Sequence, residues 1–446
     1  MRVRVARARR SAGPREQLVN VGSGRPEDSP VYADQFQIYH GNANPDLARK
    51  ICRYLGIEPG PVNVFQFANE NIFVQILDNV REKDVFIVQP TCSPADGRGD
   101  VNLSIMELLI MIDAFKRASA GRITAVVPYY AYGRSDKKDQ PRVPITARLV
   151  ADMISVAGAD RVLTMDLHQG QIQGFFNIPV DELTAVHILS NYFKHKHLED
   201  LVVVTDLGFA KRARTFAELL DAPLAIIEKR RRDNLDRAEV LNVIGEVAGK
   251  RAIIVDDDVD TAGTLIETVN ALTGEGVSEI YACASHGVLS GSAVDRINDS
   301  ALRELVLTDT VPLPPGKQVP KITTLSIAPL IGEAIKRIHR GESVGALFSS
   351  EVEFTQEMLL WEDGIAKKLD IRIQPGEGPD GPDVTEGGDA PDKGPDSTGD
   401  SGRDGGQGKG PRPPGPKDEQ GGSSEDRPAA WLRQLATTGA GEGEER

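Results

Sequence analysis

Short apolar segments that alternate with longer helical ones constrain the fold of this chain most. Seven segments are short, rich in β-branched residues and almost continuously apolar: Asp84–Pro90, Arg122–Pro128, Arg161–Asp166, Leu201–Asp206, Leu224–Ile227, Ala252–Asp257 and Glu279–Ser285. Strands with both faces covered have this composition. Helical segments lie between many of them: Leu103–Ser119, Thr146–Gly158, Ala210–Leu220 and Ala262–Gly276. The alternation predicts an α/β fold of mostly parallel sheets with helices on both faces.

The number of predicted strands indicates two similar domains, because the set is too long for one sheet. Residues Ile178–Glu182 have turn character and mark the expected boundary. We therefore expect an N-terminal domain over 35–180 and a C-terminal domain over 181–348.

Both ends of the chain differ in composition from this middle part. The first ten residues contain five arginines and no acid, and 1–34 is predicted to be a disordered extension. Residues Pro375–Arg446 hold 16 acidic against 8 basic residues and 28 Gly or Pro in 72 positions. Such a segment cannot bury enough apolar surface to fold. We expect 349–446 to be a linker and a disordered acidic tail.

Charge, cysteine usage and hydropathy narrow the class of protein. More than half of the net charge of −14 lies in the tail, so the folded part is only mildly acidic and a nucleic-acid partner is not expected. The sequence contains no run of 18 apolar residues, so a membrane span is not expected. The three cysteines, Cys52, Cys92 and Cys283, are far apart and odd in number. This pattern argues against a disulfide framework or a zinc site, and it is typical of proteins in the reducing cytoplasm.

The segment IIVDDDVDTAGT, Ile253–Thr264, combines a strand end with a turn of small and hydroxyl residues. The helix predicted to start in TAGT points its backbone N–H groups outward, where they attract an anion. Thr261 and Thr264 add hydroxyl donors, and Gly263 allows close approach of the backbone. This end of the segment is suited to a phosphate.

The aspartates of the same segment have a different use. A carboxylate pair accepts hydrogen bonds from a vicinal diol, so Asp256 and Asp257 suit the 2- and 3-hydroxyls of a ribose 5-phosphate. The alternatives are that some of these aspartates bind Mg²⁺ or that Asp260 caps the helix. The segment resembles the phosphoribosyl-diphosphate loop of the phosphoribosyltransferase fold, in which Asp256, Asp257 and Asp260–Thr264, including Ala262, bind the sugar phosphate.

Further segments extend the resemblance to about Phe36–Phe348. They are Asn102–Tyr130, Thr164–Phe176 (TMDLHQGQIQGFF), Lys229–Val240 (KRRRDNLDRAEV) and Ser285–Gly291 (SHGVLSG). Together they are similar to ribose-phosphate diphosphokinases. The resemblance implies two tandem phosphoribosyltransferase-type domains and transfer of the diphosphoryl group of ATP to the C1 hydroxyl of ribose 5-phosphate, for nucleotide biosynthesis. It also implies a need for Mg²⁺ and a homo-oligomer, usually a hexamer, with the ATP site at a subunit boundary.

The resemblance assigns further residues one by one. His168 and Asp206 match the Mg²⁺ contacts, and Lys229 and Arg231 match the catalytic pair. ATP contacts are expected from Phe67, Asn69 and Asn71, on a loop that reaches the adjoining subunit, and from Arg134, Ser135, Lys137, Lys138 and Asp139.

Four positions differ from the usual family pattern and keep a second hypothesis open. Asn71 replaces a Glu, Ser135 a Gln, Phe209 a Gly and Asp258 a Met. The changes at Asn71 and Phe209, together with the acidic tail, motivate the alternative of a silent regulatory paralogue that joins oligomers of an active synthetase. A phosphoribosyltransferase that consumes phosphoribosyl diphosphate is a third hypothesis.

Overall fold

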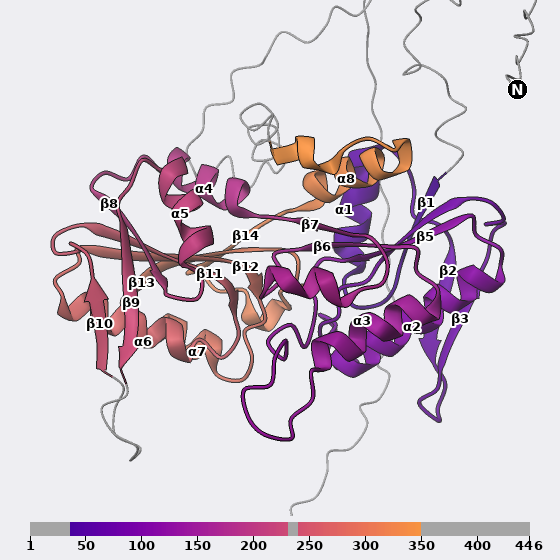
Figure 1. The fold of residues 1–446 in the computed structure, drawn as a ribbon, viewed down its shortest axis with the longest axis horizontal. Helices are drawn as coiled ribbons and strands as arrows, with labels where there is room; N and C mark the ends of the chain where they lie inside the picture. The colour runs from indigo at the N-terminus through magenta and orange to yellow at the C-terminus, as the bar shows by residue number, and fades with distance from the viewer. Residues whose placement is uncertain (1–35, 231–239, 349–446) are drawn as a thin grey trace, which may run out of the picture. The chain divides into compact units, whose positions relative to one another are not determined.

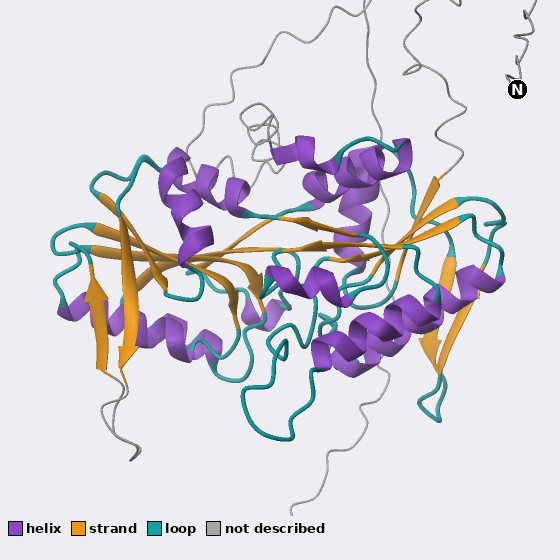
Figure 2. Cartoon of the chain, in the orientation of Figure 1, coloured by secondary structure: helices purple, strands orange, loops and turns teal. Residues whose placement is uncertain are grey.

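The computed structural model describes residues 36–230 and 240–348, which contain two separate β-sheets and a hairpin. Figure 1 shows the sheets side by side, with helices above and below each, and Figure 2 shows the same layers by type of element. The extensions expected over 1–34 and 349–446 lie outside the described residues, as does Arg231.

The first sheet has five parallel strands in the order β1-β4-β5-β6-β7. They are β1 (Phe36–His40), β4 (Asp84–Val88), β5 (Arg122–Val127), β6 (Arg161–Met165) and β7 (Val180–Leu183). Side chains of β4 alternate between two cores: Val85 and Ile87 pack with α2 (Val101–Arg117) and α3 (Thr146–Ala157), while Phe86 and Val88 pack with α1 (Pro45–Leu55). This alternation explains why the strands are apolar throughout.

Local sequence signals begin and end these helices. The side chain of Asn44 accepts a bond from the Leu47 amide at 3.2 Å, and α1 ends at Gly56, which has a left-handed φ of 68°. Asp100 caps α2 through the Leu103 amide at 2.9 Å. Such caps satisfy backbone groups that the helix leaves unpaired at its ends.

An antiparallel hairpin, β2 (Val62–Gln66) and β3 (Ile72–Ile76), packs its Val and Ile side chains on α2. Its other face carries Phe65, Phe67 and Phe73, whose ring centroids lie 5.0–5.5 Å apart. Phe65 and Phe67 are close to half exposed. The hairpin therefore presents an aromatic surface away from the core.

The second sheet has seven strands in the order β10-β9-β8-β11-β12-β13-β14, parallel except for the edge strand β10. Its strands are β8 (Leu201–Asp206), β9 (Leu224–Arg230), β10 (Val240–Ile244), β11 (Arg251–Val259), β12 (Glu279–Gly287), β13 (Leu302–Thr308) and β14 (Ile322–Leu325). In Figure 1, α4 (Val186–His195) and α5 (Ala210–Leu219) cover one face, and α6 (Gly263–Gly274) and α7 (Ala293–Asp299) the other.

The two domains are joined by a shared core. Helix α8 (Ala328–Arg340) follows the second sheet but packs against α1, and residues of both sheets contribute to one buried cluster. Lys50 forms an ion pair of 2.9 Å with Asp309, and Asn44 Nδ2 donates to the Asp309 carbonyl at 2.9 Å. These contacts join α1 of the first domain to the end of β13 in the second.

The fold class predicted from the sequence is confirmed, and every strand and helix named from its apolar pattern is present with small changes of boundary. The expected division between 180 and 181 falls within β7, which pairs with β6 from Val180 to Leu183. We therefore propose that the first domain extends to Leu183. Within the described ranges, no helix is long and apolar enough to cross a bilayer.

Candidate active site

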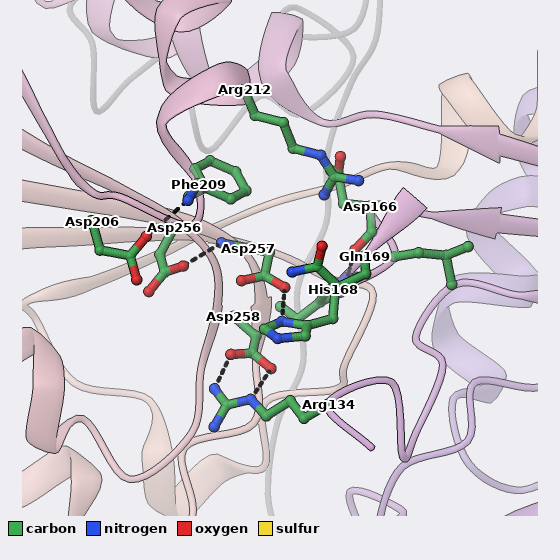
Figure 3. A network of polar contacts seen from close by, with 12 residues as sticks. Arg134, Asp166, His168, Gln169, Asp206, Phe209, Arg212, Asp256, Asp257 and Asp258 are labelled. Carbon is green, nitrogen blue, oxygen red and sulfur yellow. Dashed lines mark hydrogen bonds and ion pairs between the residues drawn. The ribbon is translucent and has the colours of Figure 1, made fainter. Parts of the chain in front are cut away.

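A cavity of about 410 Å³ lies at the carboxyl ends of β8 and β11, where residues from the first domain also reach it. Ten residues expected from the sequence line it: Arg134, His168, Asp206, Asp256, Asp257, Asp260, Thr261, Ala262, Gly263 and Thr264. Ligands of open parallel sheets bind at this edge. Figure 3 shows the aspartates grouped at the strand ends, with His168 and Arg134 beside them.

The turn between β11 and α6 forms one wall of the cavity. Ala262 has a φ of 59°, so the left-handed position that turns the chain into the helix is an alanine and not a glycine. Arg296 Nη1 supports the turn by donating to the Thr261 carbonyl at 3.0 Å. A Cβ at Gly263 would make only ordinary contacts within the chain, at 3.6 Å. A need for glycine at 263 would therefore come from a ligand over the helix N-terminus.

His168 and Asp257 join the two domains inside the site. His168 follows β6, Asp257 lies in β11, and Nδ1 of the ring is 2.7 Å from Oδ2 of the carboxylate. This bond raises the pKa of His168 above its usual value. Burial alone would raise the pKa of Asp257, but the bond and the charge of His168, together with the bond to Asp256, outweigh burial and the pKa is lowered.

Asp256 has the opposite electrostatic character. Burial, and then the charge of Asp257, raise the pKa of Asp256 well above its usual value. Its Oδ1 accepts a bond from the Asp257 amide at 2.9 Å, which holds the carboxyl group toward the cavity. Adjacent carboxyl groups with pKa values moved apart can bind hydroxyls both as acceptor and as donor.

Arg134 and Asp258 form a second link between the domains. Arg134 Nε donates to Asp258 Oδ2 at 3.1 Å, and Nη2 donates to Oδ1. The carboxylate is buried, at 8% side-chain exposure, whereas the arginine side chain is 55% exposed. Burial opposes the charge of Arg134, but the bond to Asp258 and the negative charges of Asp258, Asp257 and Asp260 together raise its pKa.

Asp206 ends β8, and its side chain organises the turn that follows. Its Oδ1 accepts a bond from the Phe209 amide at 2.8 Å. Phe209 has an ordinary φ of −99°, and its ring lies 5.8 Å from the Arg212 guanidinium, which donates to Glu182 at 2.8 Å. The turn does not require a glycine at 209, and Phe209 does not line the cavity.

A smaller cavity of about 200 Å³ adjoins the first and shares Arg134, His168, Asp257 and Asp258 with it. Asp166 lies on its wall with a φ of 36°, and its carboxylate accepts bonds from the Ala185 amide at 2.8 Å and from Ser285 Oγ at 2.5 Å. His286 Nε2 lies 3.2 Å from the Asp166 carbonyl. These bonds hold the backbone that presents His168.

Two family models match the chain: the N-terminal domain of ribose phosphate pyrophosphokinase over residues 36–158, and the phosphoribosyl synthetase-associated domain over residues 235–349. The ribose-phosphate pyrophosphokinase of Caldanaerobacter subterraneus is 54% identical over 320 residues, which cover 71% of this chain and 99% of the relative.

The chain belongs to the ribose-phosphate pyrophosphokinase family.

Other relatives of the same name agree. The Clostridium perfringens protein is 52% identical over 71% of this chain and 98% of its own length. Among solved structures, the phosphoribosylpyrophosphate synthetase from Mycobacterium smegmatis is similar with a TM-score of 0.64 and 40% identity, over 69% of this chain and 99% of that one. The resemblance predicted from the sequence, including the enzyme class, is thereby confirmed.

The pyrophosphokinase fold does not bring every expected site residue to the cavity. Phe67, Asn69 and Asn71 lie at the turn of the β2–β3 hairpin, away from it (Figure 1). Ser135 lies at the base of a loop, where its carbonyl accepts from the Ala147 amide at 3.2 Å. Lys137, Lys138 and Asp139 are exposed on that loop. Lys229 lies in β9, but its side chain and all of Arg231 are outside the described part of the chain.

Several polar side chains of the site were not predicted from the sequence, among them Thr205 and Asp258. Thr205 lines the main cavity, and Asp258 lines both cavities. The signal for Thr205 was its place one residue before the end of β8. Asp258 was visible only as a charge where the family commonly has Met, because its partner Arg134 is distant in sequence.

Proposed function

We propose that the chain transfers the β,γ-diphosphoryl group of ATP to the C1 hydroxyl of ribose 5-phosphate, giving phosphoribosyl diphosphate and AMP. The observation that carries the proposal is the cavity in which the Asp256–Thr264 loop of the second domain meets Arg134 and His168 of the first. The similarity to ribose-phosphate pyrophosphokinases over nearly their whole length supports the same conclusion.

Ribose 5-phosphate would bind along the Asp256–Thr264 loop. Its phosphate would accept bonds from the backbone and hydroxyl groups of Thr261–Thr264 at the start of α6, which line the cavity. Its 2- and 3-hydroxyls would bond to Asp256 and Asp257. The left-handed Ala262 lies within the phosphate turn, and the aspartates precede it in the chain, so the two kinds of contact come from different parts of the loop.

Mg²⁺ fits the donor groups present. The Asp257 bond occupies Nδ1 of His168, which leaves Nε2 as the ring nitrogen that can face a metal, and a carboxylate partner of this kind is usual for metal-binding histidines. Asp206 supplies a carboxylate on the same cavity. Among the residues described, no set of three or more His, Cys, Asp or Glu forms a metal cluster. Mg²⁺ commonly needs only one or two protein ligands beside substrate phosphates and water. When bound, it would neutralise charge on the diphosphoryl group.

The chain's own residues would act on ATP by position and charge. Arg134 can contact phosphate oxygens with the donors that Asp258 does not use, and by resemblance Lys229 and Arg231 would contact the transferred group. We infer that the hairpin with Phe67, Asn69 and Asn71 binds adenine in a neighbouring subunit of a homo-oligomer, which explains why it lies away from its own cavity. Lys137, Lys138 and Asp139 would close the nucleotide side of the same site.

The test is whether the purified protein forms AMP from ATP and Mg²⁺ only when ribose 5-phosphate is added. Sugar-dependent AMP would support the proposal, with a reaction lacking Mg²⁺ as the control. If the protein is folded but forms no AMP at any concentration of added inorganic phosphate, the proposal is refuted and a regulatory paralogue is favoured.

A further inference from the structure

We propose that Asp258 is a positioning residue for the nucleotide: it holds the Arg134 guanidinium across the domain junction so that the unused face of the guanidinium receives the phosphate chain of ATP. The inference rests on the proposed function and adds to it a residue that the loop pattern does not assign. It depends on the geometry of one ion pair, on the burial of its two members and on the place of that pair between two cavities.

The geometry of the pair fixes the arginine in orientation as well as in position. Both oxygens of Asp258 are used, one by Nε and the other by Nη2 of Arg134. A guanidinium held at two points by a planar carboxylate cannot rotate about its long axis. Because Asp258 lies in β11, in register with His286 of β12, its own backbone is held by the second sheet.

The burial of the pair is one-sided. Asp258 is 8% exposed in its side chain and Arg134 is 55% exposed, so the carboxylate lies behind the arginine and not between it and solvent. A guanidinium has five N–H donors, and the bidentate contact uses two of them. The remaining donors are available on the side of the cavities, both of which Arg134 lines.

The surrounding charges explain why such positioning matters. Asp256, Asp257, Asp258, Asp260 and Asp206 all line the main cavity, so the part of it described is strongly acidic and repels a free triphosphate. Arg134 follows β5 on a segment of the first domain with no strand or helix of its own before α3. Without Asp258, the arginine would lose its orientation, and ATP would have to order it on binding.

The site also offers the opposite possibility, in which Asp258 competes with phosphate for Arg134. The two possibilities predict changes of opposite sign. A positioning carboxylate improves ATP binding, so its removal raises KM for ATP; a competing carboxylate weakens ATP binding, so its removal lowers KM.

The experiment compares Asp258→Asn with the wild type in steady-state kinetics and in calorimetric binding of Mg·ATP without sugar. We expect KM for ATP and the dissociation constant to rise about tenfold, because a charge-assisted bidentate bond is lost, with little change in kcat or in KM for ribose 5-phosphate. Asp258→Met places no unpaired amide in a buried position, so it replaces the Asn variant if that variant folds poorly. It should change KM for ATP in the same direction.

Two controls separate positioning from general structural damage. Asp181→Asn removes the carboxylate of a different Arg–Asp pair, in which Asp181 on β7 bonds to Arg161. This pair lies outside both cavities, so the variant should leave KM for ATP unchanged. In an Arg134→Ala background, Asp258→Asn should have no further effect on ATP binding, because Asp258 acts through Arg134.

An unchanged or lower KM for ATP in Asp258→Asn would overturn the proposal, as would an effect that persists without Arg134. Direct ATP binding decides the question even if the wild type were found not to turn over, so failure of the inference is distinguishable from failure of the proposed function.

Discussion

The His168 ring and the Asp257 carboxylate are 2.7 Å apart although 89 residues separate them in the chain and they belong to different domains. The contact is possible because His168 follows β6 and Asp257 lies near the carboxyl end of β11, so that the two strands bring them together. It orients the imidazole and determines which nitrogen faces the cavity.

Replacing Asp257 with Asn should therefore weaken the binding of Mg²⁺. The variant loses the carboxylate that orients His168, and loss of such a partner typically costs about 10–100-fold in metal affinity or activity. Activity measured against Mg²⁺ concentration at saturating sugar should show a higher half-saturation point. Asp152→Asn, which removes a surface pair with Arg148, is the control. An unchanged Mg²⁺ curve for Asp257→Asn would argue against His168 as a metal contact.

The phosphate turn makes a sharp prediction at Ala262. A β-branched side chain is strained at a φ of 59°, so Ala262→Val should distort the turn and raise KM for ribose 5-phosphate. Ala262→Gly fits this conformation and should leave that KM near the wild-type value. The two variants are compared in the same assay with ATP saturating. Equal behaviour of Val and Gly would mean that the turn does not contact the sugar phosphate.

Lys229→Ala should lower turnover by orders of magnitude and leave binding of ribose 5-phosphate nearly intact, because its expected contact is made with the transferred group. Single-turnover kinetics and equilibrium sugar binding measure the two effects separately. Lys336→Ala on α8, which removes a cation paired with Glu333, is the matched control. Loss confined to sugar binding would contradict the role assigned to Lys229.

Mixed oligomers test whether the β2–β3 hairpin acts on a neighbouring subunit. Phe67→Ala and Lys229→Ala should each be nearly inactive alone. Mixed after dissociation and reassociation, they should regain part of the activity, because some sites then combine an intact hairpin with an intact Lys229. Size-exclusion chromatography verifies the mixing. If the mixed oligomers recover no activity, the hairpin either contacts adenine within its own subunit or does not contact it.

The environment of Glu304 leads to a prediction of how the free energy of unfolding changes with pH. Glu304 is buried beside Lys196 at 2.7 Å, and Tyr192 and Thr323 also donate to it. Burial opposes its charge, but these bonds lower its pKa from 4.5 to about 2. The stabilisation is present above the unfolded pKa and is lost as pH falls from about 4.5 toward 2. It amounts to on the order of 3 kcal/mol.

Glu304→Gln should therefore lower the free energy of unfolding at pH 7 and reduce the difference between pH 7 and pH 3, as measured by urea denaturation. Glu218→Gln, at an exposed position on α5, serves as the control. A variant as stable as the wild type at pH 7 would show that the Lys196 pair contributes nothing net.

The sequence predicts the elements whose pattern is local. The apolar strands and the Asp256–Thr264 loop could be identified because burial on both faces and helix-start chemistry leave signals within a few residues. The hairpin β2–β3 was not identified as strands, because its residues are half exposed and alternate less clearly. Residues 178–182 resembled a turn, yet Asp181 and Glu182 are accommodated in β7 by partners from distant segments, Arg161 and Arg212.

Long-range pairs mark the limit of sequence reasoning. The Arg134–Asp258 pair joins residues 124 positions apart, and neither residue carries a local signal for the other. Phe209 stands where the family has Gly. The structure shows an ordinary backbone there, with the ring against Arg212 and outside the cavity. The Arg134–Asp258 pair depends on packing between the domains, and the Phe209 outcome on the local backbone; periodicity and composition encode neither.

The central claim is transfer of an intact diphosphoryl group to the sugar, and the most direct test is to follow ATP labelled at its β-phosphorus. The label should leave with the γ-phosphate and appear in phosphoribosyl diphosphate, while AMP carries none. Label retained in ADP, or released as inorganic diphosphate without a sugar product, would contradict the function assigned to this site.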